Sequence, residues 1–177
     1  MINTCNIDTP LGVATITAEN DKLTGFWFVG QKYFASNADK TDMRGWTENY
    51  DYPVFKAVRK WIADYFAGKN PVCGFELNPR GTGFQKNIWE LLLQIPYGQV
   101  VTYGELAGRY AKKMGIERMS AQAVGGAVGH NPISLLIPCH RVVGSNGSLT
   151  GYAGGIEKKS MLLALEGVNM SSIANRK

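Results

Sequence analysis

Cys139 and His140 stand side by side in the sequence, and together they could perform nucleophilic chemistry. The thiolate is the reactive form of cysteine, and a neighbouring imidazole can generate it by taking the thiol proton. Such an imidazole needs a partner that fixes its tautomer, and Glu166, near the end of the last predicted helix, is the candidate carboxylate. A lone cysteine is more often a small core residue, so the pair by itself leaves a purely structural interpretation open.

A metal site is a weaker interpretation of these residue types. Zinc needs cysteine and histidine ligands at short, paired spacings. The cysteines and histidines of the chain show no such pairs; they are Cys5, Cys73, His130, Cys139 and His140. We therefore expect no metal, and we interpret Cys5 and Cys73 as buried structural thiols.

The composition is that of a globular protein with a core: of 177 residues, 45% are hydrophobic and 19% are charged. No apolar run is long enough to span a membrane, and the first residues lack a signal-peptide pattern. The cysteine count of three is odd and the spacing wide, which favours reduced thiols over a disulfide framework. We expect a cytoplasmic protein that does not bind membranes.

The net positive charge of the chain comes entirely from its second half. Residues 1–81 hold nine Lys and Arg and nine Asp and Glu, so 9 − 9 = 0, whereas residues 82–177 hold ten and five, so 10 − 5 = +5. A basic half permits binding to a polyanion such as nucleic acid, although a solvated basic surface is the simpler explanation of charge alone.

The first half shows strand patterns followed by one helix. The segments Leu11–Ala18 and Lys22–Val29 are rich in β-branched and aromatic residues, with a turn at Asn20-Asp21. A polar stretch, 35–52, has no helical pattern. A helix is predicted from Pro53, with apolar residues at helical spacing, to a stop near Gly68.

A stretch rich in proline and glycine, Asn70–Gly83, interrupts the chain where its charge changes. It predicts an N-terminal domain of mixed strand and helix over residues 1–75, a linker over 76–81, and a second domain over 82–177.

The second domain is predicted to be mainly helical. Four helices are expected: Phe84–Ile95, a helix from the capping box Thr102–Glu105 to about Tyr110, Ala121 to about His130 after an N-cap at Ser120, and Ile156–Glu166 with Met161, Leu162 and Leu165 on its apolar side. A basic loop, Lys112–Arg118, joins the middle two in a helix-turn-helix arrangement. The run Leu135–Ile137 reads as a buried strand that leads to Cys139.

The predicted helix Ala121–Gly129 carries three glycines in nine residues. Each interior glycine costs about 1 kcal/mol relative to alanine, so close approach to another surface must offset the cost. Tight packing against protein is slightly favoured by composition, and a fit into the DNA minor groove is the alternative. Only Gln122 could read base edges, so sequence-specific recognition is not expected.

Several motifs in one order resemble those of the O-6-alkylguanine-DNA alkyltransferases, also called methylated-DNA–protein-cysteine methyltransferases. They are Gly81–Gln85 with Trp89, Ile95–Gly98, Thr102-Tyr103, Ala123–Gly125, Asn131-Pro132, Ile137–Val142, Gly151–Gly155 and Leu163–Glu166. The resemblance is specific over residues 81–167; in the first half it rests mainly on Thr9–Gly12.

This resemblance implies an α+β protein, with a small N-terminal sheet-plus-helix domain followed by a winged helix-turn-helix-like C-terminal domain. It implies DNA repair by direct damage reversal: Cys139 takes a methyl or alkyl group irreversibly from O-6 of guanine, with O-4 of thymine as a second candidate position. The partner would be double-stranded DNA bound through its minor groove, with the alkylated base flipped out. A monomer that acts once, without a cofactor, is expected.

The resemblance also assigns residue roles. Glu166 would hold His140, which would deprotonate Cys139 through a water. Asn131 would tie the helix-turn-helix to the active-site segment, and Tyr103 would press on the phosphate beside the flipped nucleotide and donate a hydrogen bond to the departing guanine. The base pocket would be lined by Val142, Tyr152, Ala153 and Gly154, and DNA would be contacted by Ala121, Gln122, Ala123, Gly125 and Arg141.

One position departs from the family pattern. The family commonly has an arginine that fills the space left by the flipped base, and Gln122 stands there in this chain. Other interpretations remain beside the transferase: a non-catalytic binder of alkylated DNA, a cysteine hydrolase built on Cys139 and His140, and a helix-turn-helix regulator. Non-catalytic relatives replace the acceptor cysteine, so Cys139 argues against the first.

Overall fold

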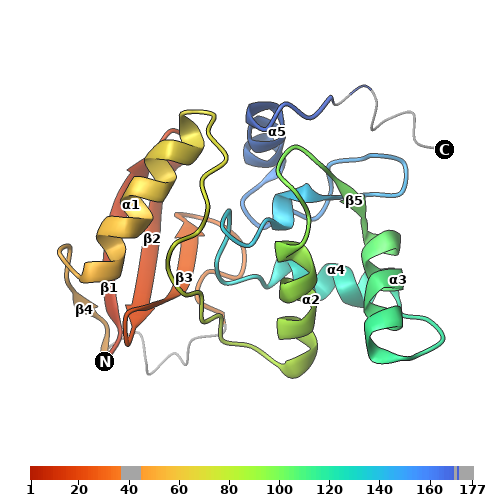
Figure 1. Ribbon diagram of the computed structural model, residues 1–177, viewed down its shortest axis with the longest axis horizontal. Coiled ribbons are helices and arrows are strands. Elements are labelled where there is room, and N and C mark those ends of the chain that lie inside the picture. The colour runs from red at the N-terminus through yellow and green to blue at the C-terminus, as the bar shows by residue number, and fades with distance from the viewer. Residues whose placement is uncertain (37–44, 170, 172–177) are drawn as a thin grey trace. The chain divides into compact units, whose positions relative to one another are not determined.

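The computed structural model describes residues 1–36, 45–169 and 171, and it separates into two compact units (Figure 1). One unit comprises Met1–Gly81 with Pro132–Leu136, and the other comprises Thr82–Asn131 with Ile137–Lys177. The segment Pro132–Leu136, which the sequence analysis placed in the second domain, therefore groups with the first unit. The mixed α+β class is confirmed.

The first unit contains a four-stranded sheet. Its strands are β1 (Asn3–Thr9), β2 (Gly12–Glu19), β3 (Lys22–Phe28) and β4 (Thr47–Glu48), in the order β3-β2-β1-β4. The two predicted strands are confirmed, and the turn between them holds Asn20 and Asp21 at φ 51° and 58°, the left-handed pair of a type I′ hairpin. β1 and β4 were not predicted. Residues 37–44 of the polar stretch 35–52 lie outside the described residues.

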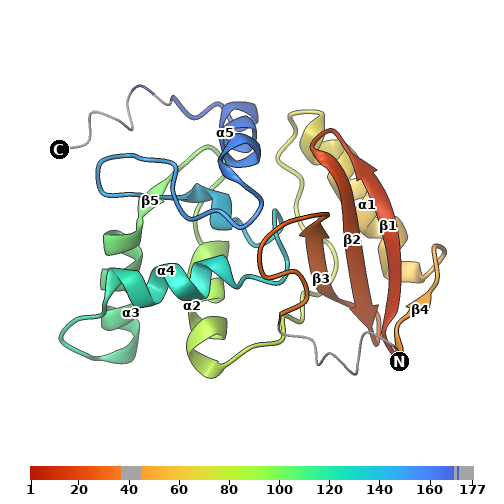
Figure 2. The same cartoon turned by 180° about the vertical axis from the view of Figure 1, so that it is seen from behind.

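Helix α1 (Pro53–Phe66) lies across one face of this sheet (Figures 1 and 2). Its proline occupies the first turn, where a missing N–H costs nothing, as the sequence predicted. Its buried face holds Val54, Phe55, Val58, Ile62 and Tyr65. The helix therefore supplies most of its apolar stripe to the core of the sheet.

The edge of β3 is covered by backbone from farther along the chain. The Phe26 N–H donates to the Pro132 carbonyl at 2.8 Å, and the Ser134 N–H donates to the Phe26 carbonyl at 2.9 Å. These bonds explain why Pro132–Leu136 belongs to the first unit. They also contradict the strand expected at Leu135–Ile137: the pairing residue is Ile133, and the chain turns at Leu135, whose φ is 72°.

In its described residues, the second unit contains α-helices and a two-stranded sheet. The helices are α2 (Gly83–Leu93), α3 (Tyr103–Met114), α4 (Ala121–Gly129) and α5 (Ile156–Leu165), and β5 (Val101–Thr102) pairs in parallel with β6 (Val142–Val143). The capping box at Thr102 and the N-cap at Ser120 are confirmed. The helix from Thr102 is longer than predicted, because the expected basic loop supplies two helix-forming lysines before Gly115 ends it at φ 66°.

Two burial expectations are wrong. Met161 is 55% exposed, and the buried side of α5 instead holds Lys159, Leu162 and Leu163. Cys73 is exposed, whereas Cys5 is buried as expected. Within the described residues, no helix is long and apolar enough to cross a membrane.

Candidate active site

Cys139 begins a short 3-10 turn, Cys139–Arg141, that leads directly into β6. Its side chain is buried, with 4% of the residue exposed, and its N–H donates to the Ile137 carbonyl at 2.8 Å. The buried Asn131 side chain donates through Nδ2 to the same carbonyl, also at 2.8 Å. Asn131, two residues after the end of α4, is thereby fixed to the segment that carries the cysteine.

The surroundings of Cys139 act on its thiol in opposite directions. Burial raises the pKa of the Cys139 thiol above its ordinary value, while the Asn131 side chain and the Lys159 cation lower it, and burial prevails. The resting residue is therefore a thiol at neutral pH. Nucleophilic attack by Cys139 requires a base that removes its proton.

His140 is suited to be that base. Its Nε2–H donates to Glu166 Oε1 at 2.8 Å, with both side chains fully buried. An ionised carboxylate only accepts, so the ring proton sits on Nε2 and the basic lone pair on Nδ1. Burial lowers the pKa of His140 below its ordinary value although Glu166 raises it, so the ring is neutral and able to take a proton.

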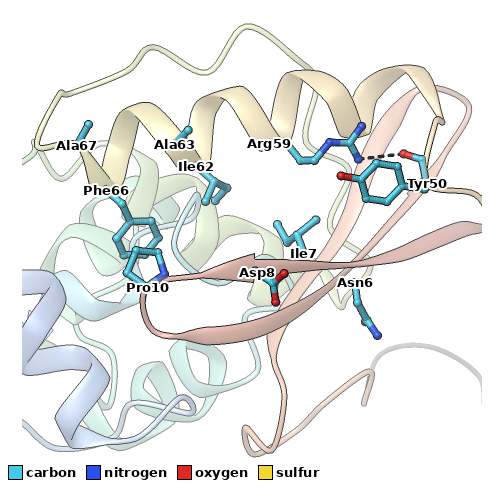
Figure 3. Close-up of a pocket in the computed structure, with 10 residues that line it drawn as sticks. All are labelled: Asn6, Ile7, Asp8, Pro10, Tyr50, Arg59, Ile62, Ala63, Phe66 and Ala67. Atoms are coloured by element: carbon cyan, nitrogen blue, oxygen red, sulfur yellow. Dashed lines mark hydrogen bonds between the residues drawn. The ribbon is translucent and has the colours of Figure 1, made fainter.

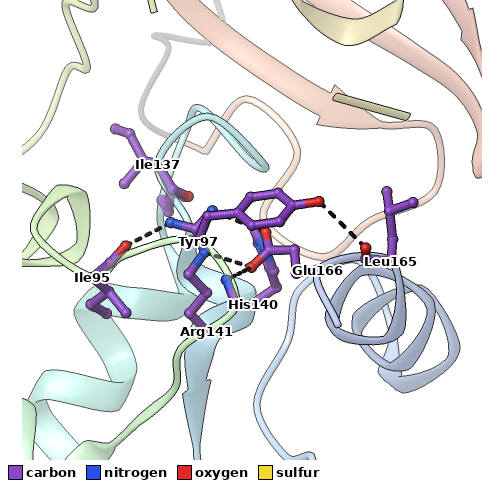
Figure 4. A network of polar contacts seen from close by, with 9 residues as sticks. Ile95, Tyr97, Ile137, His140, Arg141, Leu165 and Glu166 are labelled. Atoms are coloured by element: carbon purple, nitrogen blue, oxygen red, sulfur yellow. Dashed lines mark hydrogen bonds and ion pairs between the residues drawn. The ribbon is translucent and has the colours of Figure 1, made fainter. Parts of the chain in front are cut away.

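Glu166 is held by several donors at once (Figure 4). Arg141 donates through Nε to Oε2 and through Nη2 to Oε1, both at 2.9 Å, and the Gly98 N–H donates to Oε2 at 3.1 Å. Burial alone would raise the pKa of Glu166, but the bonds from His140 and Arg141 hold it well below its ordinary value. The carboxylate is thus a permanent negative charge that orients His140.

The expectation that Arg141 contacts DNA is corrected by this network. Its guanidinium also donates to the Ile95 carbonyl at 2.6 Å, and its side chain is 12% exposed. Paired with Glu166 in a bidentate bond, Arg141 stabilises the carboxylate instead of facing a phosphate.

The turn at Gly98 needs glycine for two reasons. Its φ is 76°, and a Cβ at this position would lie 2.9 Å from the Glu166 carbonyl oxygen. The neighbouring Tyr97 hydroxyl donates to the Leu165 carbonyl at 3.3 Å. This turn therefore fixes the end of α5 and, with it, Glu166.

Tyr103, the first residue of α3, contacts the glycine-rich loop before α5. Its hydroxyl donates to the Thr150 carbonyl at 2.9 Å, and a Cβ at Gly151 would come within 2.5 Å of that hydroxyl. Burial and the nearby Cys139 raise the pKa of Tyr103 to about 12. The phenol keeps its proton and can act as a hydrogen-bond donor at any physiological pH.

The same loop carries Tyr152, whose hydroxyl is buried and has no hydrogen-bond partner among the described residues. An unsatisfied buried hydroxyl costs about 1–3 kcal/mol, so this atom is available to a ligand that enters the site. Val142, at the start of β6, is fully buried, and Ala153 and Gly154 are half-buried. These are the residues expected to line a base pocket.

Lys159 is a site residue that sequence reasoning missed. It is fully buried, and its Nζ donates to the Val142 carbonyl and, at 2.9 Å, to the Thr150 carbonyl. Burial lowers the pKa of Lys159 to about 8, although Cys139 raises it. Its spacing from Leu162 and Leu163 placed it on the apolar side of α5, which was the signal available in the sequence.

Helix α4 presents a surface of small side chains. Ala121, Gln122, Ala123 and Gly126 are exposed, while Val124, Ala127 and Val128 are buried. The Trp89 Nε1–H donates to the Ala127 carbonyl at 2.9 Å, which fixes the buried side of α4 to α2.

The glycines of α4 differ in what lies around them. A Cβ at Gly125 would lie 3.6 Å from the Tyr103 ring, whereas one at Gly126 would meet nothing within 4 Å. Packing against protein, slightly favoured from composition, therefore does not account for Gly126. In the part of the chain that the structure describes, no cluster of acidic, cysteine or histidine side chains could hold a metal.

Known proteins resemble the chain in sequence and in structure. The family model described as 6-O-methylguanine DNA methyltransferase, DNA binding domain, matches residues 83–168, and that of its ribonuclease-like domain matches residues 5–78. A methylated-DNA–protein-cysteine methyltransferase of Mycolicibacterium paratuberculosis is 41% identical over 94% of this chain and 93% of its own. One from Haemophilus influenzae is 40% identical over 89% and 82%.

The structural match is equally extensive. The crystal structure of Mycobacterium tuberculosis OGT in complex with DNA superposes with a TM-score of 0.77 and 36% identity, covering 97% of this chain and 98% of that one. Since one family model matches each half of the sequence and the relatives align along nearly its whole length, this chain belongs to the 6-O-methylguanine DNA methyltransferase family.

Proposed function

We propose that this protein repairs DNA by moving a methyl or alkyl group from O-6 of guanine to Cys139, once and irreversibly. The observation that carries the proposal is the buried relay of a cysteine followed by His140, whose Nε2–H is held at 2.8 Å by Glu166. The relatives at about 40% identity carry the name of this activity, and a similar structure was solved with DNA. DNA is accordingly the partner.

In the proposed reaction, His140 takes the thiol proton and the sulfur attacks the alkyl carbon. A C–S bond forms, the C–O bond to guanine breaks, and its electron pair stays on the guanine, which takes up a proton. Tyr103 donates a hydrogen bond to the departing base, for which its raised pKa keeps the phenol protonated. The thioether is stable, so a chain that has reacted is spent.

The geometry of α4 supports a minor-groove approach. Its exposed side chains are uncharged and, apart from Gln122, small, which suits a narrow groove. The base must leave the stack before any nucleophile can reach it. We place Ala121, Gln122, Ala123 and Gly125 at the DNA and the flipped base beside Tyr152. A protein that acts once on one base needs no second subunit, so we propose a monomer.

The test is transfer to an oligonucleotide duplex that carries one O-6-methylguanine. After digestion, mass spectrometry should find one added methylene on the Cys139 peptide, at one equivalent and not more, with the Cys5 and Cys73 peptides unchanged as internal controls. The matched undamaged duplex should give no adduct. Binding of the damaged duplex without any adduct would instead identify the non-catalytic alternative.

A further inference from the structure

The sheet of the first unit has an open edge along β1. β4 pairs with β1 only at Asn3 and Thr4, and the last bond on that side is from the Asn49 N–H to the Thr4 carbonyl, at 2.9 Å. Among the described residues, no strand pairs with the outer side of β1 beyond that point.

The strand register fixes which groups face this edge. Thr9 and Gly12 close the β1–β2 hairpin as a bonded pair, so every second residue back from Thr9 bonds to β2. The residues between them direct their N–H and C=O groups the opposite way, as the Asn49 bond to Thr4 shows. The backbone groups of Asn6 and Asp8 therefore point away from β2 into the open edge.

A cavity of about 580 Å³ runs between this edge and α1 (Figure 3). Ile7 points from β1 toward the helix, and the helix contributes mainly apolar side chains. The lining residues are Asn6, Ile7, Asp8, Pro10, Tyr50, Arg59, Ile62, Ala63, Phe66 and Ala67. A groove with an unpaired strand along one wall has the form that an extended peptide occupies when it adds to a sheet.

One end of the groove is positively charged. Arg59 donates through Nη1 to the Tyr50 carbonyl at 2.9 Å and its guanidinium lies 4.0 Å from the centre of the Tyr50 ring. In the described part of the chain no carboxylate forms an ion pair with Arg59, unlike Arg80 with Glu19. Pro10 and Phe66 close the opposite, apolar end (Figure 3).

We propose that this edge is a docking site for an extended peptide segment of a partner protein, which adds as a strand beside Asn6–Asp8 and presents an acidic side chain to Arg59 and apolar side chains to Ile62 and Phe66. Arg59 and Phe66 are about 10 Å apart along the helix axis. Alternate side chains of a strand are about 7 Å apart, so an acidic residue followed at alternate positions by apolar ones matches the groove.

The probe is a fluorescent seven-residue peptide in which threonine alternates with glutamate, valine and phenylalanine. Binding is measured by anisotropy with the full chain. Ala63→Trp, which fills the groove from an exposed helix position, should weaken binding at least tenfold, while Ala57→Trp, an exposed alanine outside the groove, should not. Arg59→Gln should weaken binding of this peptide but not of one with glutamine in place of glutamate; Lys56→Gln is its control.

Two further measurements test the strand geometry. N-methylation of alternate residues on one edge of the peptide should abolish binding, and on the other edge it should have no effect. Hydrogen exchange of the Asn6 and Asp8 amides should slow when the peptide binds. The proposal would be overturned if the peptide did not bind at millimolar concentration, or if both sets of N-methylated peptides behaved alike. It would also be overturned by concentration-dependent dimerisation that Ala63→Trp abolishes, because a second copy of the chain would then occupy the groove.

Discussion

At the scale of single residues, Glu166 connects the parts of the relay. It is buried, and its carboxylate accepts hydrogen bonds from His140, Arg141 and the Gly98 N–H. Removal of its charge leaves the Arg141 guanidinium without its carboxylate, and a broken buried pair of this kind costs roughly 3 kcal/mol. Its contribution to chemistry and its contribution to stability must therefore be measured separately.

We expect Glu166→Gln to slow alkyl transfer, leave DNA affinity unchanged and shift the pH profile. In the wild type the rate should fall as pH drops through the pKa of His140, which burial holds below that of an ordinary histidine. Glu166 raises that pKa, so without it the acid limb should move to still lower pH while the plateau falls. Single-turnover rates across the pH range, at temperatures where the variant is folded, make the measurement; an unchanged plateau would remove Glu166 from the relay.

Lys159 should tune the thiol itself. Lys159→Met removes a buried cation that lowers the pKa of Cys139 and leaves the Val142 and Thr150 carbonyls without their donor. Without this cation the pKa of Cys139 should rise and its thiolate fraction should fall, so transfer and iodoacetamide labelling of Cys139 should both become slower. Lys158→Met is the neighbouring control. Equal labelling rates in the two variants would contradict a role for the charge.

The sequence could identify part of this site. Cys139 and His140 are adjacent, so spacing alone suggested their chemistry, and Glu166 was the candidate carboxylate from its place at the end of the last predicted helix. The resemblance supplied the role of Asn131. Lys159 was missed although its spacing placed it on the apolar side of α5, and Arg141 was named for a different role, because only the folded chain shows that this arginine turns inward to a carboxylate. Both residues are charged, and their burial depends on partners that are distant in the sequence.

At the scale of elements, local signals predicted the helices and the strands β2 and β3, but not β1 or β4. Pro53, the capping box at Thr102 and the N-cap Ser120 predicted where α1, α3 and α4 begin, because these effects act within a turn. β1 was missed since Asn3, Asn6 and Asp8 have low strand propensity and their pairing is set by β2. The run Leu135–Ile137 is buried but not a strand, because apolar residues also bury in turns.

The turn at Gly98 gives a prediction about the packing of elements. Gly98→Ala should lower stability by about 1–2 kcal/mol from its positive φ and further from contact with the Glu166 carbonyl. Gly68→Ala is the control, since its φ of 77° is the same but nothing lies within 4 Å. Thermal unfolding of both variants should rank Gly98→Ala as the less stable, and only that variant should transfer more slowly; similar losses in both would mean that strain alone acts at Gly98.

The exposed side of α4 allows a prediction about DNA binding. The resemblance in sequence places Gln122 where an arginine is expected, and its side chain is exposed. Gln122→Arg adds a cation that can approach phosphates without displacing a buried group, so DNA affinity at fixed salt should be equal or higher. Clearly weaker binding in anisotropy titrations would show that α4 does not face DNA as proposed. Ala57→Arg, at an exposed position of α1, is the control for the added charge.

At the scale of the whole molecule, the two halves of the chain differ in net charge. All of the +5 excess falls in residues 82–177, which hold α3 and α4 and the candidate site. Neutralisation of phosphates by such residues releases counterions, so DNA affinity should fall steeply with salt concentration. If the basic residues served only solubility, removal of a positive charge would change DNA affinity equally little in either half of the chain.

Arg118→Gln and Lys56→Gln distinguish these two uses of charge. Both side chains are exposed, but Arg118 lies two residues before the N-cap of α4 and Lys56 lies on α1. If Arg118 contacts a phosphate, its loss should weaken binding severalfold and reduce the slope of log affinity against log salt by about 0.9, because one fewer counterion is released. Lys56→Gln should leave both unchanged. Equal slopes for the two variants would mean that the DNA surface lies elsewhere than at the start of α4.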